Sequence, residues 1–157
     1  MEISFKGQTV LITGATRGIG AALADAFEAS GASLLLTGTD EVQCRQLTAD
    51  AVRDGHDRRY IAVDFNESAS FNAFLEEIGR LNRLDVCVNN AGINRINALA
   101  DVSEGDLDAM VAIDLRAPIL ITKAATAVMG RAAYGRVVNV GSVWNTVSKP
   151  KRSIYSA

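Results

Sequence analysis

The sequence predicts a doubly wound α/β fold, in which helices cover both faces of one parallel sheet. Short, almost continuously apolar segments alternate along the chain with longer amphipathic segments, which is the pattern of buried parallel strands joined by helices. Three glycines also stand where the first apolar segment gives way to the first amphipathic one, as a tight strand-to-helix turn requires. The chain has 157 residues, 48% of them hydrophobic, so we expect residues 1–157 to form one domain with a substantial core.

The alternation resolves into five strands and four long helices. The expected strands span residues 9–13, 33–37, 60–63, 85–88 and 136–140, and the expected helices span 19–30, 42–53, 68–80 and 104–130. Residues 153–157 have the apolar and small side chains of an opening helical turn rather than of a finished terminus. We therefore expect a sheet that is incomplete after its fifth strand, in a domain truncated on its C-terminal side.

A proline interrupts the last of these helices. Pro118 has no N–H to donate to the carbonyl of Asp114, four residues earlier. We expect a kink at this point, with that carbonyl left unpaired.

Composition and charge exclude several classes of function. The formal net charge is −2 and no block of like charge occurs, so we expect no nucleic-acid partner. No leader-like start and no run of 18 apolar residues is present, so we expect a cytoplasmic protein without a membrane partner. Cys44 and Cys87 lie far apart, without a CxxC pair or a neighbouring histidine, which favours packing over a metal site or a disulfide.

The strongest local motif is the stretch from Thr13 to Gly20, at the junction of the first strand and the first helix. Gly14, Gly18 and Gly20 permit a tight turn, let the backbone approach a pyrophosphate and allow close packing of the helix on the strand. The N-terminus of the helix adds N–H donors and a positive dipole. The spacing is GxxxGxG rather than GxGxxG, and glycines at such a turn can also be purely structural.

Four further features follow in order: Asp64 after the third strand, Asn89-Asn90-Ala91-Gly92 after the fourth, Ser142 after the fifth, and Tyr155 thirteen residues beyond Ser142. With the TGxxxGIG stretch, they make the chain resemble the short-chain dehydrogenase/reductase family over nearly its whole length. Bacterial 3-oxoacyl-carrier-protein reductases and small sugar or polyol dehydrogenases look similarly close. The resemblance implies a Rossmann-like, NAD(P)-binding domain and, for the complete chain, a homo-oligomer.

The resemblance also assigns roles to individual residues. It makes Tyr155 the acid and base at the substrate oxygen and Ser142 the donor that holds this oxygen. In the family a lysine four residues after the tyrosine lowers its pKa and holds the nicotinamide ribose; here it would be residue 159, beyond Ala157, so we expect residues 1–157 alone to be inactive. The implied cofactor-binding residues are Gly14, Thr16, Arg17, Gly18, Ile19, Gly20, Thr39, Asp64, Phe65, Asn90, Ala91 and Gly92.

Asp114 departs from the family pattern, because the family usually has a catalytic asparagine at its position. The family's proton relay uses the main-chain carbonyl there to hold a water molecule. Pro118 would free this carbonyl whichever side chain is present, so we interpret Asp114 as a tolerated replacement and keep it among the catalytic candidates. Asn94 and Trp144 are candidates for the substrate pocket, although each could equally serve packing.

The end of the second strand bears on the choice of cofactor. NAD-preferring relatives carry an acidic residue where Gly38 stands, and this residue would repel a 2′-phosphate. Arg17 and the Thr39 hydroxyl could bind such a phosphate, whereas Asp40 could instead face the ribose. The sequence therefore favours NADP over NAD.

These observations predict an NADP(H)-dependent oxidoreductase that interconverts a small-molecule carbonyl and a secondary alcohol by hydride transfer. Two alternatives remain at this point. One is a dinucleotide-binding module without catalysis, which Asp114 favours. The other is an inactive fragment of a longer enzyme.

Overall fold

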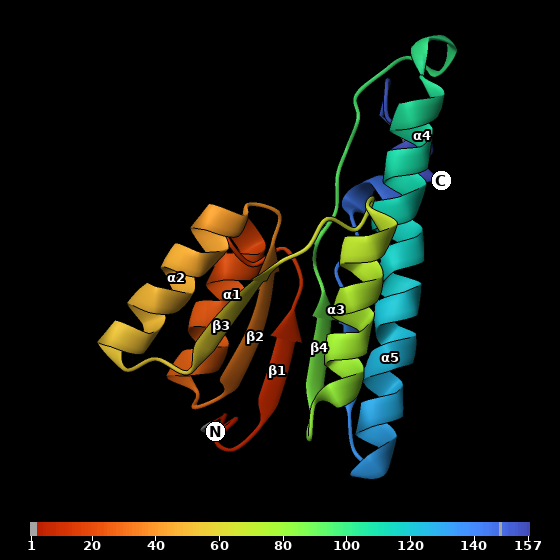
Figure 1. The fold of residues 1–157 in the computed structure, drawn as a ribbon. Helices are drawn as coiled ribbons and strands as arrows, with labels where there is room; N and C mark the ends of the chain where they lie inside the picture. The colour runs from red at the N-terminus through yellow and green to blue at the C-terminus, as the bar shows by residue number, and fades with distance from the viewer. Residues whose placement is uncertain (1–2, 148) are drawn as a thin grey trace.

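The computed structural model describes residues 3–147 and 149–157 and confirms the doubly wound α/β fold (Figure 1). All strand pairs are parallel, and the order across the sheet is β3-β2-β1-β4-β5. The strands are β1 Thr9–Ile12, β2 Ser33–Gly38, β3 Arg58–Ala62, β4 Val86–Asn89 and β5 Arg136–Asn139.

Helices lie on both faces of this sheet. Figure 1 shows α1 and α2 on one side and α3 and α5 on the other. None of the helices in the described part of the chain combines the length and apolar character needed to cross a bilayer. The helices are α1 Gly18–Ala29, α2 Glu41–Asp54, α3 Ser68–Arg80, α4 Glu104–Met110, α5 Ala117–Arg131 and α6 Ser153–Ser156.

Two apolar layers hold the helices to the sheet. Successive residues of a strand point to opposite faces, and Val10 and Ile12 accordingly pack towards Leu23 and Phe27 of α1. Leu11 packs on the opposite face, in a larger cluster with residues of α3 and α5. Because both faces of β1 are covered, its three buried residues, Val10 to Ile12, are all apolar.

The long helix expected over 104–130 divides into three parts. Between α4 and α5 lies a π turn, Val111–Arg116, in which the N–H of Ala117 donates to the carbonyl of Ala112, five residues earlier. Pro118 follows at the start of α5. Since a proline ring collides with the carbonyl four residues before it, the wider π turn accommodates Pro118. The expected kink stays a prediction.

The order of the strands identifies where a ligand can enter. The chain runs outward from β1 to β3 and then returns to place β4 on the other side of β1. In open α/β sheets, ligands bind beyond the carboxyl ends of the strands at such a reversal. The turns after β1 and β4 meet there.

Candidate active site

The turn between β1 and α1 has no room for side chains at two of its glycines. Gly14 has a φ of +64°, and a Cβ on it would lie 2.9 Å from the Cα of Ala91. A Cβ on Gly20 would lie 2.6 Å from the side-chain nitrogen of Asn90. These glycines let the turns after β1 and β4 touch, and Gly18, with a φ of +58°, faces open space.

One threonine hydroxyl joins the two turns. The Oγ1 of Thr13, which is buried, accepts hydrogen bonds from the backbone N–H groups of Asn90 and Ala91, both at 3.0 Å. The side-chain amide of Asn90 donates to the carbonyls of Thr13 and Gly14, at 2.9 and 3.0 Å. On the other side, Gly14 donates its N–H to the hydroxyl of Thr37 at 3.1 Å. The turn is therefore fixed by strands β2 and β4 as well as by its own sequence.

The N-terminus of α1 lacks a side-chain cap. Asp40, Glu67 and Ser103 each accept a backbone N–H at the start of α2, α3 and α4, whereas Arg17 makes no such bond at the start of α1. The first turn of α1 also contains no acidic residue. Free N–H groups at a helix N-terminus attract an anion, so this end of α1 fits the pyrophosphate of a dinucleotide.

A cavity of about 480 Å³ lies over these turns. All the predicted cofactor-binding residues line it except Gly20, which packs behind it. The ring of Phe65 is buried in the core with Phe71 and Phe74, which leaves its backbone for the cavity. One carboxylate oxygen of Asp64 accepts the N–H of Asn66 at 2.9 Å; an adenine amino group would pair with the other.

The residues around Gly38 bear on cofactor choice. A Cβ at Gly38 would collide with the methyl group of Thr16 and lie 3.0 Å from the sulfur of Cys44, so packing as well as charge keeps this position small. Asp40 does not line the cavity, and its carboxylate accepts the N–H of Gln43 at 2.9 Å as the cap of α2. Arg17 is exposed and lines the cavity.

The three catalytic candidates meet in a second cavity, of about 390 Å³. Ser142, Tyr155 and Asp114 line it together with Asn94, and it shares Ile19 and residues 90–93 with the first cavity. The Oγ of Ser142 accepts the N–H of Trp144 at 3.3 Å, which leaves the hydroxyl hydrogen of Ser142 to donate elsewhere. The catalytic candidates thus lie beside the candidate nucleotide site.

Asp114 projects from the π turn into this second cavity. Its Oδ1 accepts the backbone N–H of Ile93 at 2.8 Å, whereas its Oδ2 is buried without a partner among the described residues. Burial raises the pKa of this carboxyl, and the hydrogen bond from Ile93 partly opposes the shift. The protonated acid is therefore favoured here more than at an exposed aspartate.

Sequence reasoning missed three polar residues around the two cavities. Thr13 was part of a motif without an individual role, and Asn145, which lines the second cavity, carried no signal. Asn89 is buried and donates to Thr122 of α5 at 3.0 Å and Asn139 of β5 at 2.8 Å. A buried asparagine at a strand end was the available signal for Asn89, since such an amide needs partners.

The expected packing role of the two cysteines agrees with their surroundings. Both are buried and free. Burial raises the pKa of the Cys87 thiol to about 12 and also raises that of Cys44. Neither thiol is therefore a ready nucleophile at neutral pH.

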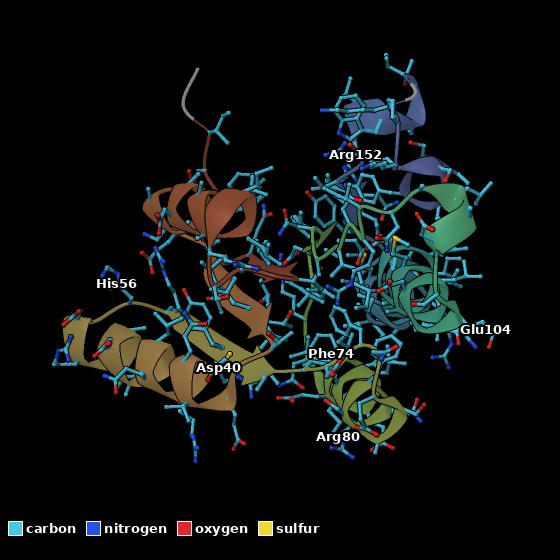
Figure 2. The ribbon with its side chains drawn as sticks, turned by 90° about the horizontal axis from the view of Figure 1, so that it is seen from above. Asp40, His56, Phe74, Arg80, Glu104 and Arg152 are labelled. Carbon is cyan, nitrogen blue, oxygen red and sulfur yellow. The ribbon has the colours of Figure 1, made fainter. Side chains whose placement is uncertain are left out.

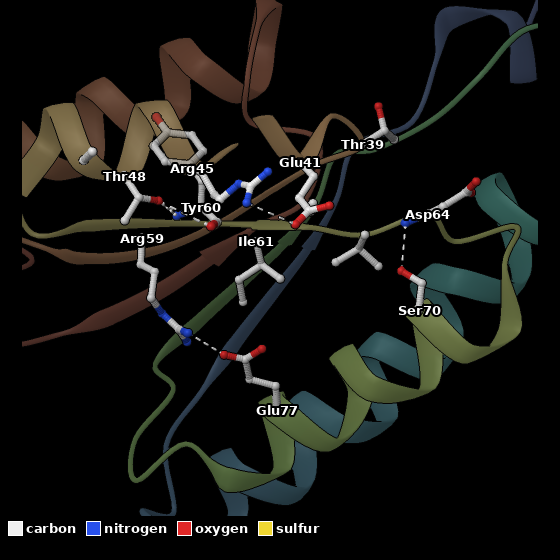
Figure 3. A pocket seen from close by; sticks show the side chains of 13 residues that line it. Thr39, Glu41, Arg45, Thr48, Arg59, Tyr60, Ile61, Asp64, Ser70 and Glu77 are labelled. Carbon is white, nitrogen blue, oxygen red and sulfur yellow. Dashed lines mark hydrogen bonds and ion pairs between the residues drawn. The ribbon is translucent and has the colours of Figure 1, made fainter. Parts of the chain in front are cut away.

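A separate hollow lies on the outer edge of the sheet, between α2 and α3 (Figure 3). Four of its charged side chains form ion pairs, Arg45 with Glu41 and Arg59 with Glu77. At its wall the hydroxyl of Thr48 accepts the outward N–H of Tyr60 at 2.9 Å, which protects the edge strand β3 from pairing with another chain. This hollow meets the nucleotide cavity only at Thr39, Val63 and Asp64.

A comparison with models of known protein families shows to which family this chain belongs. The model of the short chain dehydrogenases matches residues 8–157. The chain belongs to the short-chain dehydrogenase family. This agrees with the family's sequence motifs, which all fall around the two adjoining cavities.

Individual members of the short-chain dehydrogenase family show the same relationship. The 3-oxoacyl-[acyl-carrier-protein] reductase FabG of Escherichia coli is 31% identical over 158 residues, which cover 99% of this chain and 63% of FabG. A gluconate 5-dehydrogenase from Burkholderia cenocepacia, solved with NADP and tartrate, superimposes with a TM-score of 0.87 at 27% identity and covers 99% of this chain and 61% of its own. A metagenomic short-chain oxidoreductase in complex with NADP has a TM-score of 0.86 at 31% identity, with coverages of 99% and 71%. The chain therefore spans less than two thirds of the FabG and gluconate dehydrogenase chains.

Proposed function

We propose that the protein carrying these residues is an NADP(H)-dependent oxidoreductase that interconverts a carbonyl and a secondary alcohol. The observation that carries this proposal is the junction of the two cavities. The predicted cofactor residues surround one, the three catalytic candidates line the other, and Ile19 and residues 90–93 belong to both. A nicotinamide held in the first cavity would thus lie against a substrate in the second.

NADP is favoured over NAD as the cofactor. Arg17 and Thr39 line the nucleotide cavity beside Gly38, so a guanidinium and a hydroxyl are available for a 2′-phosphate. Asp40, the competing ligand for the ribose hydroxyls, is engaged as a helix cap. The solved relatives with bound NADP support the same choice.

NADPH, held by the residues that line the first cavity, would supply the hydride for the carbonyl carbon of the substrate. Tyr155 donates its hydroxyl proton to the carbonyl oxygen and regains one from solvent, so that the products are the alcohol and NADP⁺. Ser142 donates a hydrogen bond to the same oxygen. Its hydroxyl hydrogen is free to do so, because its oxygen accepts the bond from the backbone N–H of Trp144. Asp114 holds the loop at Ile93 against the cavity and thereby positions the floor that both cavities share.

The proposal is tested with the protein encoded by the complete reading frame that contains these residues. NADPH oxidation is followed with a panel of ketones for the parent protein and for Tyr155→Phe and Ser142→Ala. We expect turnover in the parent and losses of at least about a hundredfold in each variant, the range for a general acid or an oxyanion donor. Binding of NADPH should change little, because both side chains lie in the second cavity. Tight NADPH binding without turnover of any ketone would instead indicate a module that only binds the dinucleotide.

A further inference from the structure

Two cations lie on one aromatic ring in the segment that joins Ser142 to Tyr155. The Nζ of Lys149 is 5.2 Å and the Cζ of Arg152 is 5.3 Å from the ring centroid of Trp144. An indole ring attracts each cation by only about 0.5–1 kcal/mol at exposed sites, and the two cations repel each other. The structure shows no ion pair for either side chain within residues 3–147 and 149–157.

None of the ion pairs among the described residues joins a carboxylate of the neighbouring helix α4 to either cation. The helix α4 packs against α6 and carries Glu104, Asp106 and Asp108. Of these, Asp106 is already engaged by Arg95 at 3.5 Å and by the side-chain amide of Asn97 at 3.1 Å. Figure 2 shows Arg152 on the C-terminal segment, on the α4 side of the molecule and far from Asp40 of α2. The positive charge at Trp144 is therefore available to a ligand.

Buried polar atoms without hydrogen-bond partners occur on two residues of the catalytic cavity and on two residues close to Tyr155 in the chain. Five such side-chain atoms occur among the described residues, and four of them belong to Asn94, Asp114, Arg152 and Ser156. Asn94 and Asp114 line the catalytic cavity, and Arg152 and Ser156 flank Tyr155 in the chain. A buried polar atom that lacks a hydrogen bond costs about 1–3 kcal/mol. A polar ligand in the catalytic cavity would supply bonds to the two of these residues that line it, Asn94 and Asp114.

The cations are also connected to the catalytic candidates through the backbone. Arg152 is the N-cap residue of α6 and its carbonyl accepts the N–H of Ser156 at 2.9 Å, which places it less than one helical turn before Tyr155. Trp144, on which both cations lie, donates its backbone N–H to Ser142. The two cations and the two catalytic hydroxyls are therefore carried by one short stretch of the chain.

We propose that the substrate carries an anionic oxygen group, a carboxylate or a phosphate, that Arg152 and Lys149 bind while its carbonyl faces Ser142 and Tyr155. This inference rests on the proposed function. The guanidinium of Arg152 can donate two parallel hydrogen bonds to two oxygens of such a group, and the ammonium of Lys149 adds a second positive charge.

Matched pairs of substrates test this inference in the complete protein. The ketone 3-oxobutanoate is compared with its methyl ester, and dihydroxyacetone phosphate with dihydroxyacetone, in the parent protein and in Arg152→Gln and Lys149→Gln. We expect the parent to prefer one charged member by at least about tenfold in kcat/KM, and each variant to lose most of that preference, because kcat/KM falls more for the charged member than for the neutral one. The matched control is Lys151→Gln, a cation of the same segment that makes no contact with the Trp144 ring; it should behave as the parent. The pair that shows the preference identifies the group as carboxylate or phosphate.

Equal rates on charged and neutral members would overturn the inference and leave the proposed function standing. An equal loss on both members in Arg152→Gln would also overturn it, since that result describes a purely structural arginine. Should no ketone be reduced, the proposed function fails, and binding is then read directly from the fluorescence of Trp144, the single tryptophan of these 157 residues. With NADP⁺ present, saturable quenching by 3-oxobutanoate or dihydroxyacetone phosphate, but not by the neutral members, supports the anion site; no quenching by either anion contradicts it.

Discussion

The hydroxyl of Thr13 shows how much of the site depends on single side chains. It accepts two backbone N–H groups from the turn after β4 and so joins that turn to the end of the first strand. Asp114 has a comparable position, with one oxygen on Ile93 and the other buried without a partner in the described residues. The motif pattern identified the glycines around Thr13, because their need for space is local. It could not identify the contacts of Thr13 or Asp114, because these join residues 77 and 21 positions apart.

Arg17 is expected to determine the preference for NADPH over NADH. In the complete protein, Arg17→Ala should weaken NADPH binding by about tenfold and leave NADH binding within about twofold, since we propose that the guanidinium binds the extra phosphate, which NADH lacks. Fluorescence titration with both nucleotides measures this. The matched control is Arg45→Ala, which removes an exposed arginine of α2 that lies outside the nucleotide cavity. A parent protein that binds NADH more tightly would contradict the assignment of NADP.

Asp114 is expected to make stability depend on pH. Its pKa in the folded protein is raised by burial, so its contribution is fully present below the ordinary carboxyl pKa and is lost as the pH rises through the raised value. Asp114→Asn keeps an acceptor for Ile93 and cannot ionise. The difference in Tm between this variant and the parent should therefore grow in favour of the variant from acid to neutral pH. The exposed Asp108→Asn on α4 serves as control, and a pH-independent difference for Asp114→Asn would refute the burial effect.

At the scale of the elements, periodicity predicted the existence and order of the strands and helices but not two of their details. Strand β3 begins at Arg58 rather than at residue 60, because Arg58 pairs with Asp25 and Glu28 of α1 and Arg59 pairs with Glu77 of α3. Charged residues resemble a loop until such distant partners are known. The helix over 104–130 has the apolar pattern of one continuous element, and only Pro118 signals the π turn. Insertions of this kind are frequent at functional sites, and here the turn carries Asp114.

Replacing Pro118 tests whether the π turn is needed for catalysis. In Pro118→Ala the new N–H can donate to the carbonyl of Asp114, which favours an ordinary α turn and rotates Asp114 away from Ile93. We expect turnover to fall by about tenfold or more, with thermal stability kept or increased. Ile119→Ala, which truncates an exposed neighbour, should have little effect on turnover. If Pro118→Ala has the same turnover number as the parent, the π turn is not needed for catalysis.

At the scale of the whole molecule, the site exists because the strand order reverses between β1 and β4. The reversal places the N-terminus of α1, the turn after β4 and the end of β5 at one edge of the sheet. The two cavities meet at this edge, with nucleotide-binding candidates on one side and Ser142 and Tyr155 on the other. From the order of the motifs along the sequence, this arrangement could be inferred only because the motifs resemble those of a known family. The shared wall of Ile19 and residues 90–93 became visible only in three dimensions.

The most direct test of this account follows the hydride itself. The complete protein is incubated with a reducible ketone and NADPH that carries deuterium at C4 on the transferred face, with the opposite face labelled in a parallel reaction. The account predicts that one deuterium appears on the carbinol carbon of the alcohol from one of the two labelled cofactors, and that Tyr155→Phe suppresses its formation. An alcohol that contains no deuterium from either cofactor, or undiminished transfer in Tyr155→Phe, would contradict it.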